Sequence, residues 1–237
     1  MSINTKDRTE KTEIMDDFSL EGEELVEALD KIARINQLLG GNKLTLDGIK
    51  QLLKQATAHE VIHITDIGCG NGDMLRMLAD YGYKNHLSLK LTGLDANAFT
   101  IQYAQKLSAD YPNIDYRCMD IFSDEFQKTT YDIVLCTLTL HHFTNEQVID
   151  LITIFKTNAR MGIVINDLQR SKLAYRLFAI IAVVISLNRM SREDGLTSIL
   201  RGFKKRELQN FSEIAQLKKY NIKWKWAFRY QWLIFKI

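Results

Sequence analysis

Hydrophobic and polar positions change their period along this chain near residue 60. Before that point, apolar residues recur at helical spacing from Leu25 to Leu39, and a shorter pattern predicts a second helix over residues 46–55. The residues before the first helix are mostly polar and charged. We therefore expect a flexible segment over residues 1–20 and a helical lid over residues 21–57.

From residue 61 onward, short apolar runs rich in β-branched and aromatic residues alternate with helical patterns. Thr144 and Gln147 have the spacing of a capping box at the start of one such helix. The alternation predicts an α/β fold in which helices cover both faces of a parallel sheet. Strands are predicted at 61–67, 89–95, 114–118, 131–137 and 161–166, with helices near 71–82, 97–110 and 145–158.

The alternation stops after residue 166, and the rest of the chain follows a different pattern. The main domain is expected over residues 58–237, with a helical insertion at about 169–200. The chain ends in two strand-like runs separated only by Arg229, which predicts an antiparallel pair at a sheet edge. In order, the predicted elements are a long helix at about 169–189, a polar turn containing Asp194-Gly195, a helix near 204–219, and strands at 221–228 and 230–236.

Composition is that of an ordinary globular protein, with 46% hydrophobic and 25% charged residues. The three cysteines are widely spaced without a C-x-x-C pair, which indicates reduced thiols. Together with the polar start of the chain, which does not look like an export signal, this predicts a cytoplasmic protein. The apolar run Leu177–Ile185 is shorter than the ~20 residues that a membrane span requires, so no transmembrane span is predicted.

Charge is unevenly distributed behind a net value of +2. Residues 1–60 hold 8 Lys/Arg and 12 Asp/Glu, whereas residues 200–237 hold 10 Lys/Arg and 2 Asp/Glu. A basic end can attract nucleic acid, anionic lipid or an acidic protein. Because these basic residues are interleaved with Trp, Phe and Ile, a solvated face on a packed element remains the alternative.

A glycine-rich loop follows the first predicted strand, in the sequence ITDIGCGNG over residues 64–72. Doubly wound folds bind nucleotides at such loops, because backbone amides and a helix N-terminus lie together at the carboxyl edge of the sheet. Asp73 stands where a dinucleotide fingerprint needs glycine, and the Gly-Lys-Ser/Thr of a P-loop is absent. The sequence therefore argues against both phosphate-binding alternatives, while a ligand-free turn remains an alternative.

The D-x-G-x-G-x-G pattern of this loop resembles the first cofactor motif of class I S-adenosylmethionine-dependent methyltransferases. Three further segments follow in the order found in that family: Gly-Leu-Asp-Ala-Asn around Asp95, Cys-Met-Asp-Ile-Phe around Asp120, and Leu-Thr-Leu-His-His-Phe over residues 138–143. The resemblance covers residues 20–237 and is strongest over residues 61–166.

The resemblance implies a Rossmann-like, doubly wound sheet of seven strands whose last strand is antiparallel, with a helical lid. It also implies S-adenosylmethionine as the cofactor and S-adenosylhomocysteine as its product. In this family Asp66 would suit the ammonium group, Asp95 the ribose hydroxyls and Asp120 the adenine amino group, although either of the latter two also fits a helix cap. The implied cofactor-binding residues are Asp66, Gly68, Cys69, Gly70, Asn71, Gly72, Asp95, Ala96, Asp120, Ile121 and Thr137.

Methyl transfer is an in-line displacement that depends on alignment and on exclusion of water, and a base is optional. His141 and His142 follow the fourth strand and Asp167 follows the fifth, so these three are the candidate catalytic residues. The structural alternatives are histidines that stack or hold a loop, and an aspartate that caps a helix. No third ligand is visible beside the histidines, so no metal site is predicted.

The helical insertion bears on the acceptor, because its apolar residues would form a cover over the site. This favours a small hydrophobic or aromatic acceptor, with a hydroxyl oxygen as the methylated atom. Residues 194–203 look like a segment of bacterial methyltransferases near quinone, polyketide and phenolic-lipid pathways. Arg170, Ser198 and Arg201 are the predicted acceptor-binding residues, although Arg201 could instead pair with an acid of the N-terminal segment.

Other functions remain open at this point. A ring carbon is the close alternative for the methylated atom, and the acceptor could be tethered to an acidic carrier protein. Nucleic acid is disfavoured, because the Asn/Asp-Pro-Pro-Tyr/Phe run of many base-methylating relatives is missing. A domain that binds the cofactor without turnover, a monomer or a homodimer, and a contact of residues 177–187 with a membrane or a partner also remain open.

Overall fold

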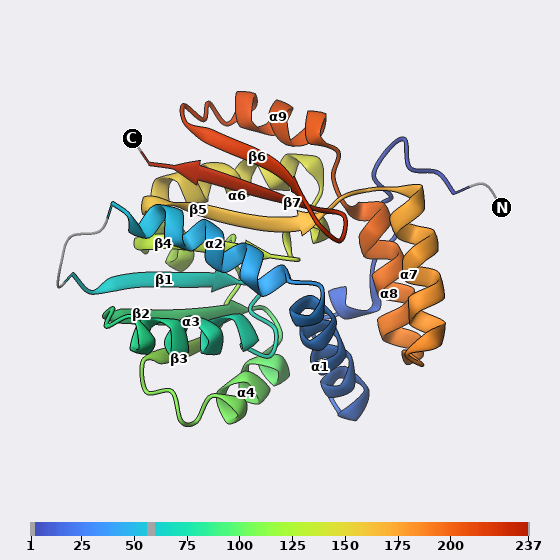
Figure 1. Cartoon of the computed structure of the whole chain (residues 1–237), viewed down its shortest axis with the longest axis horizontal. Coiled ribbons are helices and arrows are strands. Elements are labelled where there is room, and N and C mark those ends of the chain that lie inside the picture. The colour runs from blue at the N-terminus through green and yellow to red at the C-terminus, as the bar shows by residue number, and fades with distance from the viewer. Residues whose placement is uncertain (1–2, 56–59, 237) are drawn as a thin grey trace.

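The computed structural model describes residues 3–55 and 60–236, and its seven strands form one sheet with helices on both faces (Figure 1). The sheet order is β3-β2-β1-β4-β5-β7-β6. The predicted boundary at residues 57 and 58 lies outside the described residues, as do both ends of the chain. The strands are β1 (Ile62–Ile67), β2 (Leu89–Asp95), β3 (Ile114–Cys118), β4 (Tyr131–Thr137), β5 (Ala159–Leu168), β6 (Tyr220–Lys225) and β7 (Arg229–Phe235).

Strands β1 to β5 are parallel, and β7 runs antiparallel to both of its neighbours. The predicted fold class is therefore confirmed, including the reversed last strand and its pairing with β6 at the sheet edge. Since β1 pairs with both β2 and β4, the connections leave β1 in opposite directions. In open α/β sheets such a point creates a crevice at the carboxyl ends of the strands, where ligands bind.

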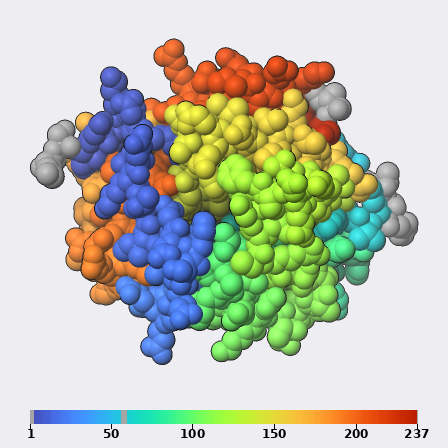
Figure 2. All heavy atoms as spheres, turned by 180° about the vertical axis from the view of Figure 1, so that it is seen from behind, coloured from blue at the N-terminus to red at the C-terminus, as the bar shows by residue number. Residues whose placement is uncertain are grey.

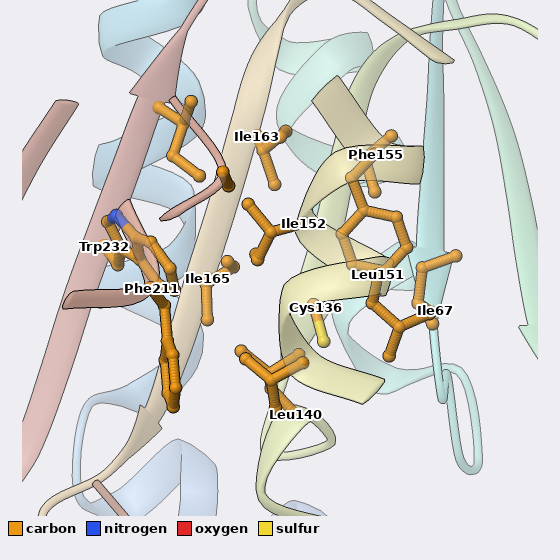
Figure 3. Close-up of a cluster of buried hydrophobic side chains, with 14 of the residues drawn as sticks. Ile67, Cys136, Leu140, Leu151, Ile152, Phe155, Ile163, Ile165, Phe211 and Trp232 are labelled. Carbon is orange, nitrogen blue, oxygen red and sulfur yellow. The ribbon is translucent and has the colours of Figure 1, made fainter. Parts of the chain in front are cut away.

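Two hydrophobic cores lie on the two faces of the sheet. Helices α2 (Gly41–Leu53), α3 (Asp73–Lys84) and α4 (Ala98–Leu107) pack on one face. Helices α5 (Asp124–Lys128), α6 (Asn145–Asn158) and α9 (Lys205–Ile214) pack on the other. Figure 3 shows this second core, in which aromatic rings meet β-branched side chains of β5; labelled there are Phe155, Ile163, Ile165, Phe211 and Trp232.

Local signals in the sequence explain several helix boundaries. Helix α6 starts at the predicted capping box, where Thr144 Oγ1 accepts a hydrogen bond from Gln147 N and Gln147 Oε1 accepts one from Thr144 N. Helix α2 begins at Gly41, five residues before the predicted start at Leu46. The short helix α5 was not predicted, and α9 ends at Ile214 rather than near residue 219.

The prediction of one long helix followed by a polar turn was wrong. The segment folds as two helices, α7 (Lys172–Val184) and α8 (Arg189–Arg201), and Asp194-Gly195 lies inside α8. Asn188 Oδ1 accepts a hydrogen bond from Ser191 N, which starts the new helix. Gly195 serves helix packing, since a Cβ there would lie 2.3 Å from Phe178 Cζ of α7.

The N-terminal segment lies against the domain. Figure 2 shows it in dark blue beside the orange helices α7 and α8, and it leads into a short 3-10 helix, η1 (Ile14–Asp16), and then α1 (Glu23–Leu38). Arg8 donates hydrogen bonds of 2.8 Å to the carbonyls of His141 and Phe143. Mobility of residues 1–20 stays a prediction, but residues 3–20 are part of the packed structure.

Among residues 3–55 and 60–236, no helix combines the length and the hydropathy that crossing a membrane would require.

Candidate functional site

A cavity of about 1310 Å³ opens at the carboxyl edge of the sheet, where the strand connections diverge. Its wall combines the ends of β1, β2 and β4 with the N-terminal segment and helices α1, α7 and α8. All of the predicted cofactor-binding residues line it except Gly72. His141, His142, Ser198 and Arg201 line it as well, whereas Asp167 lies behind the wall and Arg170 lies away from it.

The glycine loop between β1 and α3 has positive φ at Gly68, Gly70 and Gly72, of 66°, 53° and 77°. A Cβ at Gly68 would lie 2.4 Å from Thr139, and one at Gly72 would lie 2.0 Å from the hydroxyl of Tyr116. A Cβ at Gly70 would meet only an ordinary contact at 3.7 Å. Two of the glycines are therefore required by the protein's own packing, and Gly70 leaves bare backbone toward the cavity.

Asp66 lines the cavity, and the residue is only 3% exposed. Its Oδ1 has no hydrogen-bond partner in the described part of the chain. Burial raises the pKa of Asp66 to about 8, and the negative charges of Asp73 and Asp95 add to this. A cationic group next to Asp66 would relieve the cost of ionising this carboxyl.

Asp95 closes β2 and braces the glycine loop. Its Oδ2 accepts a hydrogen bond of 3.2 Å from Gly70 N, and its Oδ1 accepts one of 3.0 Å from Asn97 N. Burial raises the pKa of Asp95. The helix-cap alternatives were wrong for both predicted acids, because Asn97 caps α4, and Ser123, not Asp120, caps α5. Asp120 is exposed at the cavity rim.

Helices α1 and α2 contact the glycine loop and the end of β4. Asn71 Nδ2 donates to Asp30 Oδ1 of α1 at 3.0 Å, and the hydroxyl oxygens of Thr137 and Thr45 of α2 are 3.1 Å apart. The remaining predicted cofactor-binding residues are Cys69, which is buried, Ala96, which is half-buried, and Ile121, which is nearly covered.

His141 and Asp167 form a buried, oriented pair. Asp167 Oδ1 accepts from His141 Nδ1 at 2.7 Å, and Oδ2 accepts from the backbone amide of His141 at 3.1 Å. Burial raises the pKa of Asp167, but the charge and the hydrogen bond of His141 outweigh this effect and hold the pKa below its usual range. With Nδ1 carrying the proton, the lone pair of Nε2 is free to act as a base. The cap alternative for Asp167 was wrong, since Ser171 caps α7.

Glu13 of the N-terminal segment faces this histidine, and the sequence contained no signal for it. Glu13 Oε1 lies 3.7 Å from His141 Nε2, and neither atom has a hydrogen-bond partner among the residues described. Burial raises the pKa of Glu13 to about 7, against the hydrogen bond that Ser198 Oγ donates to Oε2 at 2.7 Å. Two titratable groups thus face each other in the cavity wall.

Asp16 and Arg201 lie beside Glu13 and the two histidines. Asp16 Oδ1 lies 2.6 Å from His142 Nδ1, and its Oδ2 accepts from Arg201 Nη1 at 2.5 Å. Burial opposes ionisation, but hydrogen bonds from His142 and Arg201 hold the pKa of Asp16 well below its usual range. The alternative role of Arg201, pairing with an acid of the N-terminal segment, is confirmed. Asp194 anchors the segment by accepting from the amides of Ile14 and Met15, at 2.7 and 3.0 Å.

The expectation of no metal site rested on the lack of a third ligand, and the structure supplies one. Glu13, His141 and His142 each offer a ligand atom, and these atoms lie within 4.8 Å of one another. However, the Arg201 guanidinium lies 3.7 Å from Glu13 Oε1, and its positive charge opposes a cation there. Proton exchange fits this group better than metal binding.

Arg170 lies outside the cavity and has a structural environment. Its guanidinium pairs with Glu207 at 2.5 Å, donates to Gly202 O at 2.5 Å, and holds the carbonyls of Thr5 and Lys6. The predicted role in binding the acceptor has no support from this position.

Arg229 is a cavity residue that the sequence pattern marked only as a turn. It is the first residue of β7 and 3% exposed, and it lines the cavity. In the described structure its Nε and Nη1 have no hydrogen-bond partner, and burial lowers its pKa to about 10.

Comparison with known proteins places the glycine loop and both strand-end acids inside a recognised domain. Residues 64–162 match a family model described as a methyltransferase domain. The ubiquinone biosynthesis O-methyltransferase of Rickettsia akari (strain Hartford) is 26% identical over 145 residues, covering 58% of this chain and 54% of that protein. The chain spans about half or less of the length of the curated relatives it matches.

Solved structures with the same fold extend over most of the chain. The plantazolicin methyltransferase BpumL in complex with S-adenosylhomocysteine (SAH) has a TM-score of 0.65 at 19% identity, covering 88% of this chain and 89% of that one. Magnesium protoporphyrin IX methyltransferase (ChlM) from Synechocystis PCC 6803 with bound SAH has a TM-score of 0.54 at 15% identity, covering 84% and 85%. At these identities the likeness is one of fold.

Proposed function

We propose that this chain, whose residues 64–162 belong to the methyltransferase domain family, is an S-adenosylmethionine-dependent methyltransferase. Its acceptor is a small apolar or aromatic molecule that carries a hydroxyl group, and the hydroxyl oxygen receives the methyl group. The observation that carries this proposal is the His141–Asp167 pair, whose unpartnered Nε2 belongs to the wall of the same cavity as the glycine loop.

The residues at the carboxyl edge fit the cofactor. Asp66 supplies an unpartnered, buried carboxylate oxygen that suits the ammonium group of the methionine part. Gly70 leaves room beside its backbone, and Asp95 keeps acceptor capacity for ribose hydroxyls next to it. Asp120 and Ile121, at the far rim, would bind the adenine. When bound, S-adenosylmethionine supplies a methyl group on a positively charged sulfur.

The chain's own residues would prepare the acceptor. His141 Nε2 accepts the proton of the acceptor hydroxyl, and Asp167 orients the ring and stabilises the imidazolium that results. Glu13, with its raised pKa, lies where it can exchange that proton with the histidine. The N-terminal segment and the lid helices close over these groups and limit access of water.

A ring carbon remains the second candidate for the methylated atom. An activated carbon needs no deprotonation of a hydroxyl, so the oriented histidine favours oxygen over carbon. The apolar residues of α7 that line the cavity, including Phe178 and Ile181, support an apolar or aromatic acceptor over a polar one. Cytoplasmic location and a monomeric or homodimeric state stay predictions.

The first experiment is titration calorimetry of the purified protein with S-adenosylmethionine and SAH. We expect micromolar binding that is lost in Asp95→Ala and retained in His141→Asn. A panel of phenols and quinols is then screened for release of SAH, with His141→Asn as the inactive control. Absence of binding of either compound to the parent protein would overturn the assignment. Turnover unchanged in His141→Asn would remove the proposed base.

A further inference from the structure

Helix α7 carries a continuous apolar stripe on its outer side. Apart from the neighbours Ile180 and Ile181, the stripe residues are spaced by three, four, seven, eight or eleven positions, which places them on one side of a helix. Ile180 is 61% exposed and Val184 is 76% exposed. The buried Ala182 lies on the opposite side of the helix, against the rest of the protein. The stripe comprises Leu173, Leu177, Ile180, Ile181 and Val184, all of them exposed.

The charged residues of α7 and of the loop that follows it have a single sign. Between Asp167 and Glu193 the sequence contains no acidic residue and five basic ones. Lys172 and Arg176 flank the stripe on α7 itself, and both are exposed. Arg189 and Arg192 are exposed at the start of α8, directly after the loop that follows α7, and Arg189 Nε pairs with Glu193 Oε1 at 2.9 Å. An aliphatic face bordered by basic side chains is typical of helices that lie in the plane of an anionic membrane surface.

The stripe also continues into the cavity. Leu177 and Ile181 are each 41% exposed and also line the cavity, together with Phe178. Trp226, which is 73% exposed, lines the same cavity from the turn between β6 and β7. Figure 1 shows α7 and α8 standing at one end of the molecule, beside the end of the sheet where the cavity opens.

We propose that the outer face of α7 docks this protein on the surface of an anionic lipid bilayer. The helix lies in the interface with its stripe among the lipid headgroups and acyl chains, and the basic residues contact the anionic headgroups. An apolar acceptor dissolved in the membrane would then enter the cavity past Leu177 and Ile181. This last step rests on the proposed function, whereas the docking itself does not.

Charge favours a lipid surface over a second copy of this chain as the partner of the α7 stripe. A second copy of the chain that packed its α7 on the first would place Lys172 and Arg176 of both copies in one interface, where α7 has no acidic residue to pair with them. A lipid surface instead matches the basic border with negative charge and the stripe with hydrocarbon. It also needs no shape complementarity, which suits a convex helix face.

The test is flotation of the full chain with vesicles of phosphatidylcholine alone and of phosphatidylcholine mixed with phosphatidylglycerol. We expect binding to the mixed vesicles that weakens as salt rises. Ile180→Asp and Val184→Asp should each lower the partition coefficient about tenfold or more, since each withdraws one aliphatic side chain from the interface. Arg176→Gln should lower it about threefold to fivefold and reduce its salt dependence.

Matched controls separate docking from folding and from catalysis. Tyr83→Asp replaces a 90% exposed apolar residue on α3 and should leave vesicle binding unchanged. SAH titration of every variant should match the parent, since Ile180, Val184 and Arg176 are not among the cavity residues. Vesicle binding without SAH binding would retain the docking and overturn the methyltransferase proposal.

Three results would overturn the docking proposal. The first is equal binding, or no binding, of the parent chain to the two kinds of vesicle. The second is vesicle binding that Ile180→Asp leaves intact. The third is a dimer in sedimentation experiments that Ile180→Asp dissociates, because the stripe would then be covered by a second copy.

Discussion

Glu13→Gln tests the buried acid that faces His141, through the dependence of stability on pH. Burial raises the pKa of Glu13 from 4.5 to about 7 in the folded protein. Between these values the folded chain keeps a proton that the unfolded chain has lost. The free energy of unfolding therefore falls as pH rises from about 4.5 through 7. Each pKa unit corresponds to about 1.4 kcal/mol, so this loss amounts to about 3 kcal/mol.

Glutamine cannot ionise, and its side-chain oxygen can still accept the hydrogen bond from Ser198. We therefore expect the stability of Glu13→Gln, relative to the parent, to increase by about 3 kcal/mol from about pH 4 to about pH 8. For a chain of this length that corresponds to a relative rise in Tm of about 6–12 °C. Titrating groups that do not interact with Glu13 are present in both proteins and cancel in the difference.

The assay is urea unfolding of parent and variant at a series of pH values, followed by circular dichroism. Glu10→Gln is the control, because Glu10 is exposed on the same segment and should change stability by less than about 0.5 kcal/mol at every pH. A Glu13→Gln variant that differs from the parent by a constant amount from acid to alkaline pH would refute the reasoning. Glu13 would then be ionised across the range, paired with Arg201 and His142.

Three further predictions concern the base, the loop and the core. Asp167→Asn should lower kcat about 10²–10⁴-fold in SAH-release assays while SAH affinity by calorimetry stays within about twofold, because it disturbs the orientation of His141. Gly72→Ala should destabilise by about 2 kcal/mol or more in urea, since its methyl group meets Tyr116, whereas Gly70→Ala should lose less stability but weaken SAH binding at least about tenfold. Phe155→Ala should lower the free energy of unfolding in urea by about 3–5 kcal/mol, because the ring is fully buried in the core of Figure 3. Three results would contradict these predictions: a kcat unchanged in Asp167→Asn, an equal loss of stability in Gly70→Ala and Gly72→Ala, or a Phe155→Ala variant as stable as the parent.

The positions of the residues proposed to bind the cofactor were predictable, because these residues stand at the ends of strands. A strand can be recognised from its apolar run, and the carboxyl ends of parallel strands meet at one edge of the sheet. The sequence pattern therefore suffices to place Asp66, Asp95 and Asp120 together. The same reasoning brings His141 and Asp167 to that edge, although their hydrogen bond depends on side-chain geometry.

The surroundings of the residues proposed for the acceptor were less predictable, because they depend on contacts between segments that are far apart in sequence. Asp194-Gly195 has the local propensity of a turn, yet both residues lie in α8. The carboxylate of Asp194 holds the amides of the N-terminal segment there, and Gly195 makes room for Phe178. Tertiary packing thus overrides the local preference at this point.

By itself, the sequence determined the alternation of strands and helices, the reversed pair at the sheet edge and the glycine loop, because each depends on the period or composition of a short stretch. Only the tertiary structure decided that Glu13 faces His141, that Asp16 pairs with Arg201, and that Arg170 is buried away from the cavity. Such pairings join residues whose separation along the chain carries no periodic signal. They form because packing of the helices on the sheet brings the N-terminal segment against α8 and the end of β4.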